Sequence, residues 1–248
     1  MPDTPNFRFY QHPRFSANQI AEYLCTLDAP QREAVIRKAK FPKNVALAAY
    51  RDIVPPIRSF LGSNTGDLSR LDGIIQSLKG KKDHPSEYVR DEARRCLAMI
   101  DSLKETVAKA KLLKSTFCAG PHDLRLNIEG VSINVRLDAS ISDQNKNGDT
   151  FEGGCVLIMT ASLEGRKDIE ARTKTTAGVI HWAIENQKPN ASVAPRLCAS
   201  FDVHGRDIIR ASDSYVTLRR RIESSCREAV GWWDRVHPPE GYDGPDWR

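Results

Sequence analysis

Hydrophobic periodicity divides the chain into a helical first half and a second half that alternates strands and helices. In the first half, apolar side chains recur three and four residues apart, as in SANQIAEYLCTLD (residues 16–28) and PSEYVRDEARRCLAMIDSLKETVAKAKLL (residues 85–113). This spacing places apolar side chains on one face of an α-helix. We therefore expect residues 1–115 to form a helical region.

Local signals predict where the first helices begin and break. Ser16 can cap the first helix, whose inward stripe is Ile20, Tyr23, Leu24 and Leu27. The stretch NVALAAYRDIVPPIRSFLG (residues 44–62) is also helical in pattern, but it contains Pro55 and Pro56. Proline removes a backbone donor and crowds the preceding turn, so we expect two helical pieces there.

After His122 the apolar residues recur at every second position, as in a β-strand. Apolar residues alternate with polar ones on both sides of a turn at Glu129-Gly130, which predicts a hairpin with one solvated face. The run CVLIM (residues 155–159) is continuously apolar and predicts a strand buried on both faces, in the interior of the sheet. Helices over 168–186 and 214–235 are expected to pack on this sheet.

The sequence thus predicts an α+β fold. An N-terminal helical region (1–115) leads into a helix-flanked mixed β-sheet domain (116–235), and a Pro/Gly-rich irregular tail (236–248) follows. From the long helix onward the predicted order is α-β-β-β-α-β-β-α.

This order resembles the core of the PD-(D/E)xK nuclease-like superfamily, whose fold is restriction-endonuclease-like. In sequence, QREAVIRKAKFPKNVALAAYR, EGVSINVRLDASI and RLCASFDVHGRDIIRASDSYVTLRRRIESSCREAVGWW resemble a family of uncharacterised bacterial proteins, over roughly Ala17 to Trp233. That family brings no known activity. The superfamily implies a nucleic-acid context, such as a subunit of a DNA-processing or defence assembly.

The resemblance directs attention to Asp138. In the superfamily pattern a Pro-Asp pair ends the second strand and a lysine lies in the third; here Leu137-Asp138 keeps the aspartate without the proline, and CVLIM has only apolar side chains. A Mg²⁺-dependent phosphodiesterase needs hard oxygen ligands and a group that orients the attacking water. Glu152 precedes the strand and Lys167 follows it, so they join Asp138 only if the loops fold back.

Two interpretations of Asp138 therefore stand side by side. It is either an ordinary solvated aspartate at the end of a strand or a catalytic metal ligand acting with Glu152 and Lys167. We favour the solvated aspartate, because structural carboxylates outnumber catalytic ones.

Three basic groups are candidates for contact with nucleic acid. The candidates that we single out are Arg219, Arg220, Arg221, Arg37, Lys38 and Lys43; their neighbours Arg227 and Lys40 and a third group, Lys104, Lys109, Lys111 and Lys114, extend the pattern. A solvated helix surface explains any one group as well as phosphate contact does. A formal net charge of +5, from 37 Lys and Arg against 32 Asp and Glu, permits nucleic-acid binding without requiring it.

Other polar residues have simpler explanations. Asp202 and His204 follow a strand in FDVHGRD, where turn formation explains them, and His181 with Trp182 reads as a surface histidine beside a packed aromatic ring. The six cysteines lack the short spacing of a zinc or redox site, which indicates free thiols in a reducing compartment. No phosphate-binding glycine loop, HExxH, GxSxG or dinucleotide motif is present.

Composition and the N-terminal sequence bear on the class of protein and on its expected cellular compartment. With 40% hydrophobic and 28% charged residues the chain is typical of a globular protein, and it has no apolar run near the roughly 20 residues that span a bilayer. The N-terminus, MPDTPNFRFYQHPRF, lacks the layout of a secretory signal, so we expect a cytoplasmic protein. No pattern specifies an oligomeric state.

Three hypotheses follow. The first is a nucleic-acid-associated protein whose nuclease-like core has lost catalysis and needs no cofactor. The second is an active Mg²⁺-dependent nuclease with catalytic residues displaced to Asp138, Glu152 and Lys167. The third is a protein–protein interaction module whose basic groups are only solvated surface.

Overall fold

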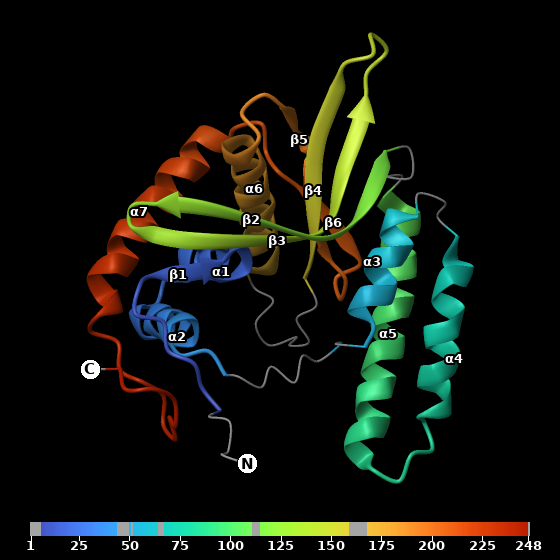
Figure 1. Cartoon of the computed structure of the whole chain (residues 1–248), viewed down its shortest axis with the longest axis horizontal. Helices are drawn as coiled ribbons and strands as arrows, with labels where there is room; N and C mark the ends of the chain where they lie inside the picture. The colour runs from blue at the N-terminus through green and yellow to red at the C-terminus, as the bar shows by residue number, and fades with distance from the viewer. Residues whose placement is uncertain are drawn as a thin grey trace.

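The computed structural model describes residues 6–43, 50, 52–63, 67–110, 115–158 and 168–247. Its elements, in chain order, are β1 (Arg14–Ser16), α1 (Ala17–Cys25), α2 (Ala29–Lys40), α3 (Val54–Gly62), the 3₁₀ helix η1 (Leu68–Leu71), α4 (Asp72–Gly80), α5 (Glu87–Ala110), β2 (Thr116–Ile128), β3 (Val131–Gln144), β4 (Thr150–Ile158), α6 (Ile169–Gln187), β5 (Ser192–Asp202), β6 (Asp207–Arg210) and α7 (Tyr215–Trp233). Helices cover both sides of a central sheet (Figure 1).

Six strands of the described residues form one mixed sheet. The order is β2-β3-β4-β5-β6; β4 and β5 are parallel, and the other neighbours in this order are antiparallel. β1 was not predicted: it pairs in parallel with residues 132–134 of β3, so the N-terminal region contributes a strand as well as helices. The α+β class, the element order from α5 onward and the interior position of β4 are confirmed.

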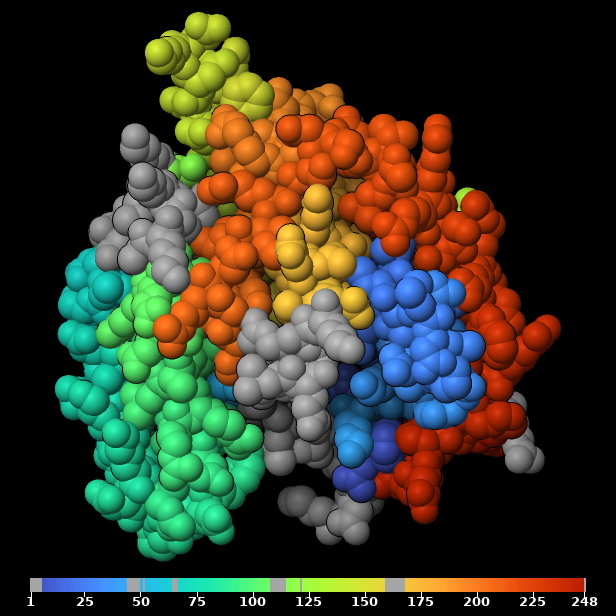
Figure 2. All heavy atoms as spheres, turned by 180° about the vertical axis from the view of Figure 1, so that it is seen from behind, coloured from blue at the N-terminus to red at the C-terminus, as the bar shows by residue number. Residues whose placement is uncertain are grey.

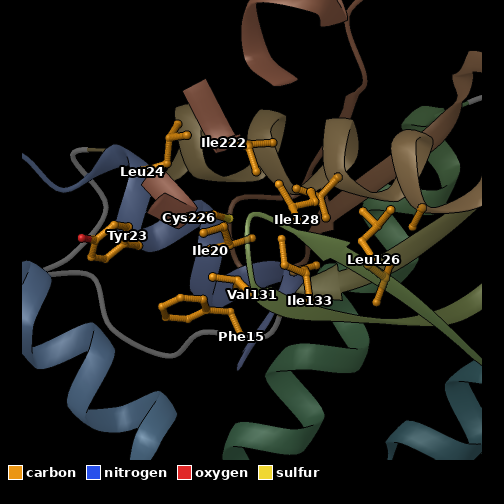
Figure 3. Close-up of a cluster of buried hydrophobic side chains, with 14 of the residues drawn as sticks. Phe15, Ile20, Tyr23, Leu24, Leu126, Ile128, Val131, Ile133, Ile222 and Cys226 are labelled. Atoms are coloured by element: carbon orange, nitrogen blue, oxygen red, sulfur yellow. The ribbon is translucent and has the colours of Figure 1, made fainter. Parts of the chain in front are cut away.

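The sheet separates two hydrophobic cores. One side holds α1, α2, α6 and α7, which bury Ile20, Ile133 and Cys226 around the β2–β3 hairpin (Figure 3). The other side holds α3, α4 and α5, which bury Ile57, Met99 and Leu157. β4 supplies side chains to both cores, because Val156 faces the first and Leu157 the second.

Local sequence explains the helix ends. Ser16 caps α1 and forms a capping box with Gln19, as its position predicts. Leu27 was wrongly placed on the inward stripe: α1 ends at Cys25 and Leu27 is 92% exposed. Pro55 and Pro56 begin α3, where the missing N–H groups cost little, and the preceding segment lies largely outside the described residues.

The N-terminal segment from Asn6 onward and the C-terminal tail meet beside α2 and α7. Trp233 Nε1 donates to the backbone oxygens of Tyr10 and Gln11, and the Asp243 carboxylate accepts from the backbone N–H groups of Asn6 and Phe7. The predicted tail has no helix or strand in its described residues, but Asp243 ties it to the N-terminal segment at Asn6 and Phe7. Figure 2 shows the N-terminal helices lying against the C-terminal segment on the rear face. In the described part of the chain, no helix is long and apolar enough to cross a membrane.

Candidate functional site

Asp138 lies at the position where the pairing of β3 with β4 ends. At the same position the buried side chains of β3 pass from one hydrophobic core to the other. Residues 139–144 of β3 pair with β4, and this ladder ends at Ala139 opposite Cys155. Leu137 belongs to the first core and Ala139 to the second. Asp138 is therefore the residue at which β3 parts from β4.

A bulge in β2 faces Asp138. The β2–β3 register passes from Ala119 opposite Ala139 to His122 opposite Leu137, so two residues of β2 oppose one of β3. A side chain at Gly120 would place its Cβ 2.6 Å from the Asp138 carbonyl oxygen, which no other residue tolerates. Gly120 thus permits the close approach of the two strands at this bend.

Both oxygens of the Asp138 carboxylate are engaged by the protein. Its Oδ1 accepts from Arg58 Nε at 2.7 Å and lies 2.6 Å from an Arg58 terminal nitrogen, while Oδ2 accepts from Leu157 N–H at 2.7 Å. Leu157 lies beyond the last β3–β4 pair, so the side chain of Asp138 replaces a ladder partner. One carboxylate links α3, β3 and β4.

Asp138 is consequently not the solvated aspartate that we favoured. It is 5% exposed, and both of its oxygens bind groups of the protein. A buried carboxylate requires such partners, because an unpaired charge in the interior costs several kcal/mol. The partner was missed because Arg58 lies 80 residues away in sequence.

Glu152 does not lie beside Asp138. It opposes Ser142 on the β3–β4 ladder, and it is four residues from Val156, so about 13 Å of strand separates it from the bend at Asp138. Its carboxylate forms an ion pair with Lys188 instead. Lys167, the third predicted catalytic residue, lies outside the described residues. Within the described ranges, no three His, Cys, Asp or Glu side chains are grouped so as to hold a metal ion.

Arg219 has a structural role between α6 and α7. Its guanidinium forms an ion pair with Glu185 and stacks 4.4 Å from the Tyr215 ring centre and 5.2 Å from that of Trp182. Arg220 and Arg221, by contrast, are exposed and have no ion pair among the described residues. The predicted triplet therefore separates into one packing residue and two solvated cations.

His181 is buried beside Arg219, which corrects its assignment as a surface histidine. It is 1% exposed; its Nδ1 lies 3.4 Å from an Arg219 nitrogen and its Nε2 lies 3.5 Å from Glu185. Burial lowers the pKa of His181; Glu185 opposes this effect and Arg219 adds to it. The neutral imidazole is the form that the fold accommodates.

Because His181 is buried, we expect the stability of the fold to decrease at acid pH. Because the folded-state pKa lies below the unfolded value of about 6.5, unfolding takes up a proton as the pH falls below 6.5. His181 should then reduce stability from about pH 6.5 downward, by at most ~1.4 kcal/mol per pH unit. Urea unfolding of His181→Gln should show a shallower acid slope than wild type, whereas His12→Gln, at an exposed site, should not. Equal slopes in all three proteins would contradict the assignment.

The basic group around α2 also contains both a packed cation and exposed ones. Lys40, predicted to lie on a basic surface, is 3% exposed: its Nζ donates to the backbone oxygens of Trp233 at 2.7 Å and Val236 at 3.2 Å. It thereby caps the C-terminal end of α7, where a cation is favoured. Burial lowers the pKa of Lys40, and Asp234 opposes this shift. Lys38 and Lys43 are exposed, and Arg37 pairs with Glu33.

The remaining candidates have structural explanations. Asp202 accepts from Gly205 N–H and closes the predicted turn after β5. His204 lies 3.4 Å from the hydroxyl of Tyr50, a contact that sequence spacing could not reveal. In the third basic group, Lys104 is half-buried on α5, and the side chains of Lys109, Lys111 and Lys114 lie outside the described residues.

The cysteines are free thiols, as predicted. Burial raises the pKa of Cys96, Cys198 and Cys226 to about 12, so their thiols stay protonated near neutral pH. Cys118 is an exposed residue of β2.

Comparison with known protein families finds no family model that matches the chain, and comparison with curated proteins finds no match either.

Proposed function

We propose that this chain is a nucleic-acid-associated protein with a nuclease-like core that does not cleave its ligand. The observation that carries the proposal is the engagement of Asp138 by Arg58 and by Leu157 N–H. A metal-dependent nuclease needs a carboxylate with free lone pairs beside a second ligand. Here a guanidinium neutralises the carboxylate, and the flanking positions in β4 are Val156, Leu157 and Ile158.

The order of elements supports a nuclease-like core. From α5 onward the chain runs helix, three antiparallel strands, helix, then a strand parallel to the third. The superfamily resemblance gives the proposed nucleic-acid context and a role as a noncatalytic subunit of a DNA-processing or defence assembly. On α7, Arg220 and Arg221 are exposed and have no ion pair among the described residues, so they can meet phosphate.

Charge reversal tests this surface without disturbing the packing of Arg219. Arg220→Glu/Arg221→Glu should weaken binding to duplex DNA at least about tenfold, regardless of sequence, because phosphate contacts carry no base readout. The slope of log K against log salt should become less steep by about 1.8 if each arginine neutralises one phosphate. Fluorescence anisotropy of a labelled duplex measures both quantities.

The matched control is Lys79→Glu/Lys82→Glu. These exposed lysines belong to α4 and the turn after it, at the opposite end of the molecule from α7, and their reversal changes net charge equally (Figure 1). The control should bind like wild type at every salt concentration. Absence of wild-type binding near physiological salt, or equal binding by both double variants, would contradict the proposed binding of nucleic acid.

A second candidate function is a protein-interaction module, favoured by one apolar surface. Leu27 is 92% exposed and Trp232 is 42% exposed, and both line a hollow of about 220 Å³ above the Arg32–Glu228 ion pair. Exposed apolar side chains around a hollow are typical of docking surfaces. This candidate becomes the better account if DNA binding is absent.

A further inference from the structure

A hollow of about 660 Å³ lies where the N-terminal segment, α2 and the C-terminal tail meet. Its apolar wall includes Phe7, Ala34, Phe41 and Pro42, and Pro239 lines it from the tail. Ligand sites commonly measure roughly 300–1,000 Å³ and are mainly apolar with a few charged groups. The hollow has the size and lining of a site for a small molecule.

Contacts among the N-terminal segment, the residues that follow α2 and the C-terminal tail hold the hollow in shape. The Arg8 N–H donates to the Pro42 oxygen at 2.9 Å, and Phe7 forms an isolated β-bridge with Lys43. The Tyr242 ring lies against Phe7 and Phe41, with ring centres 5.6 and 5.2 Å apart. Since these walls are already packed, binding would require little ordering of the protein.

The charged groups around the hollow are mainly basic. Arg37, Lys38 and Lys43 line it, with Glu240 as the acidic side chain among its described lining residues. Glu33 compensates Arg37, whereas Lys38 is exposed without an ion pair in the described part of the chain. The Lys43 ammonium lies 5.8 Å from the centre of the Phe7 ring, so one cation stands directly over the apolar wall.

We propose that this hollow is a binding site for an aromatic phosphate monoester. The apolar part of the ligand would occupy the space between Ala34, Phe41 and Pro239, and the phosphate would meet Lys38 and Lys43. A phosphate monoester close to an aromatic ring occurs both in a free phosphorylated aromatic metabolite and at a phosphorylated end of a nucleic acid, where the terminal base supplies the ring. The site goes beyond the proposed function, because it uses neither Arg220 nor Arg221.

Binding of 1-naphthyl phosphate to the full chain tests the site. Calorimetry should show saturable binding at least tenfold tighter than that of 1-naphthol or inorganic phosphate, because only the ester meets both the wall and the ammonium groups. Lys38→Glu/Lys43→Glu should weaken this binding at least tenfold. Ala34→Phe, which fills the hollow, should abolish it. Lys79→Glu/Lys82→Glu should bind as wild type does.

Folding of each variant is checked by its thermal unfolding midpoint, and the charge-reversal variant keeps the test valid if Ala34→Phe is unfolded. A 5′-phosphorylated oligonucleotide that competes with the probe, when its unphosphorylated counterpart does not, would identify a nucleic-acid end as the source. Lack of competition by both would exclude a nucleic-acid end and leave a free ester as the source. No saturable binding at millimolar probe, or equal binding by folded Lys38→Glu/Lys43→Glu and wild type, would overturn the proposal.

Discussion

Replacing Arg58 by methionine is expected to lower the free energy of unfolding by about 3 kcal/mol. Methionine preserves much of the side-chain volume but removes the guanidinium that binds Asp138 Oδ1. The carboxylate is then left buried with one backbone partner, and breaking a buried pair in this way costs roughly 3–5 kcal/mol. We place the effect at the lower end because the Arg58 side chain is 16% exposed.

A double-mutant cycle separates the ion pair from the packing of Arg58. Asp138→Asn retains an oxygen that can accept from Leu157 N–H, so Arg58→Met/Asp138→Asn should be more stable than Arg58→Met alone by about 1 kcal/mol or more. Arg94→Met, which removes an exposed i,i+3 pair with Asp91, is the control and should change stability by less than about 0.5 kcal/mol. Denaturant unfolding that gives Arg58→Met the same small effect would contradict a structural role for the pair.

Replacing Lys40 by methionine should lower the free energy of unfolding by about 2 kcal/mol. The ammonium group satisfies the backbone oxygens of Trp233 and Val236, and a buried acceptor that loses its donor costs roughly 1–3 kcal/mol. Relief of the buried charge offsets part of this loss. Because these contacts join α2 to the end of α7, the effect should appear in global unfolding.

Lys38→Met is the matched control, since Lys38 is exposed two positions earlier on the same helix. Its effect should stay within about 0.5 kcal/mol, as for most surface substitutions. If Lys40→Met proved as stable as Lys38→Met, the buried ammonium would make no net contribution to the fold.

Much of the fold could be predicted because its signals are local. The apolar run CVLIM (155–159) predicted an interior strand, of which residues 155–158 are described, and Ser16 predicted the start of α1. β1 was missed because a three-residue strand has no periodicity to detect; it exists only through pairing with β3. The exposed position of Leu27 was missed because the apolar stripe continues past the point where the helix ends.

The candidate site was less predictable because its contacts join distant residues. Asp138 could be identified as unusual, but its partner Arg58 comes from another helix, and the bend that buries it depends on Gly120 in β2. Likewise, Lys40 and Arg219 belong to basic runs that look solvated in sequence. Tertiary contacts with Trp233 and Glu185 give these two cations roles in packing.

The most direct test of the central claim is a cleavage assay with purified protein, Mg²⁺ or Mn²⁺, and single- and double-stranded DNA and RNA. Because Arg58 and Leu157 N–H already bind the Asp138 carboxylate, all four substrates should remain intact, and Asp138→Ala should behave like wild type in this assay. Metal-dependent cleavage by the wild type that disappears in a folded Asp138→Ala protein would contradict the claim. It would establish Asp138 as a catalytic ligand.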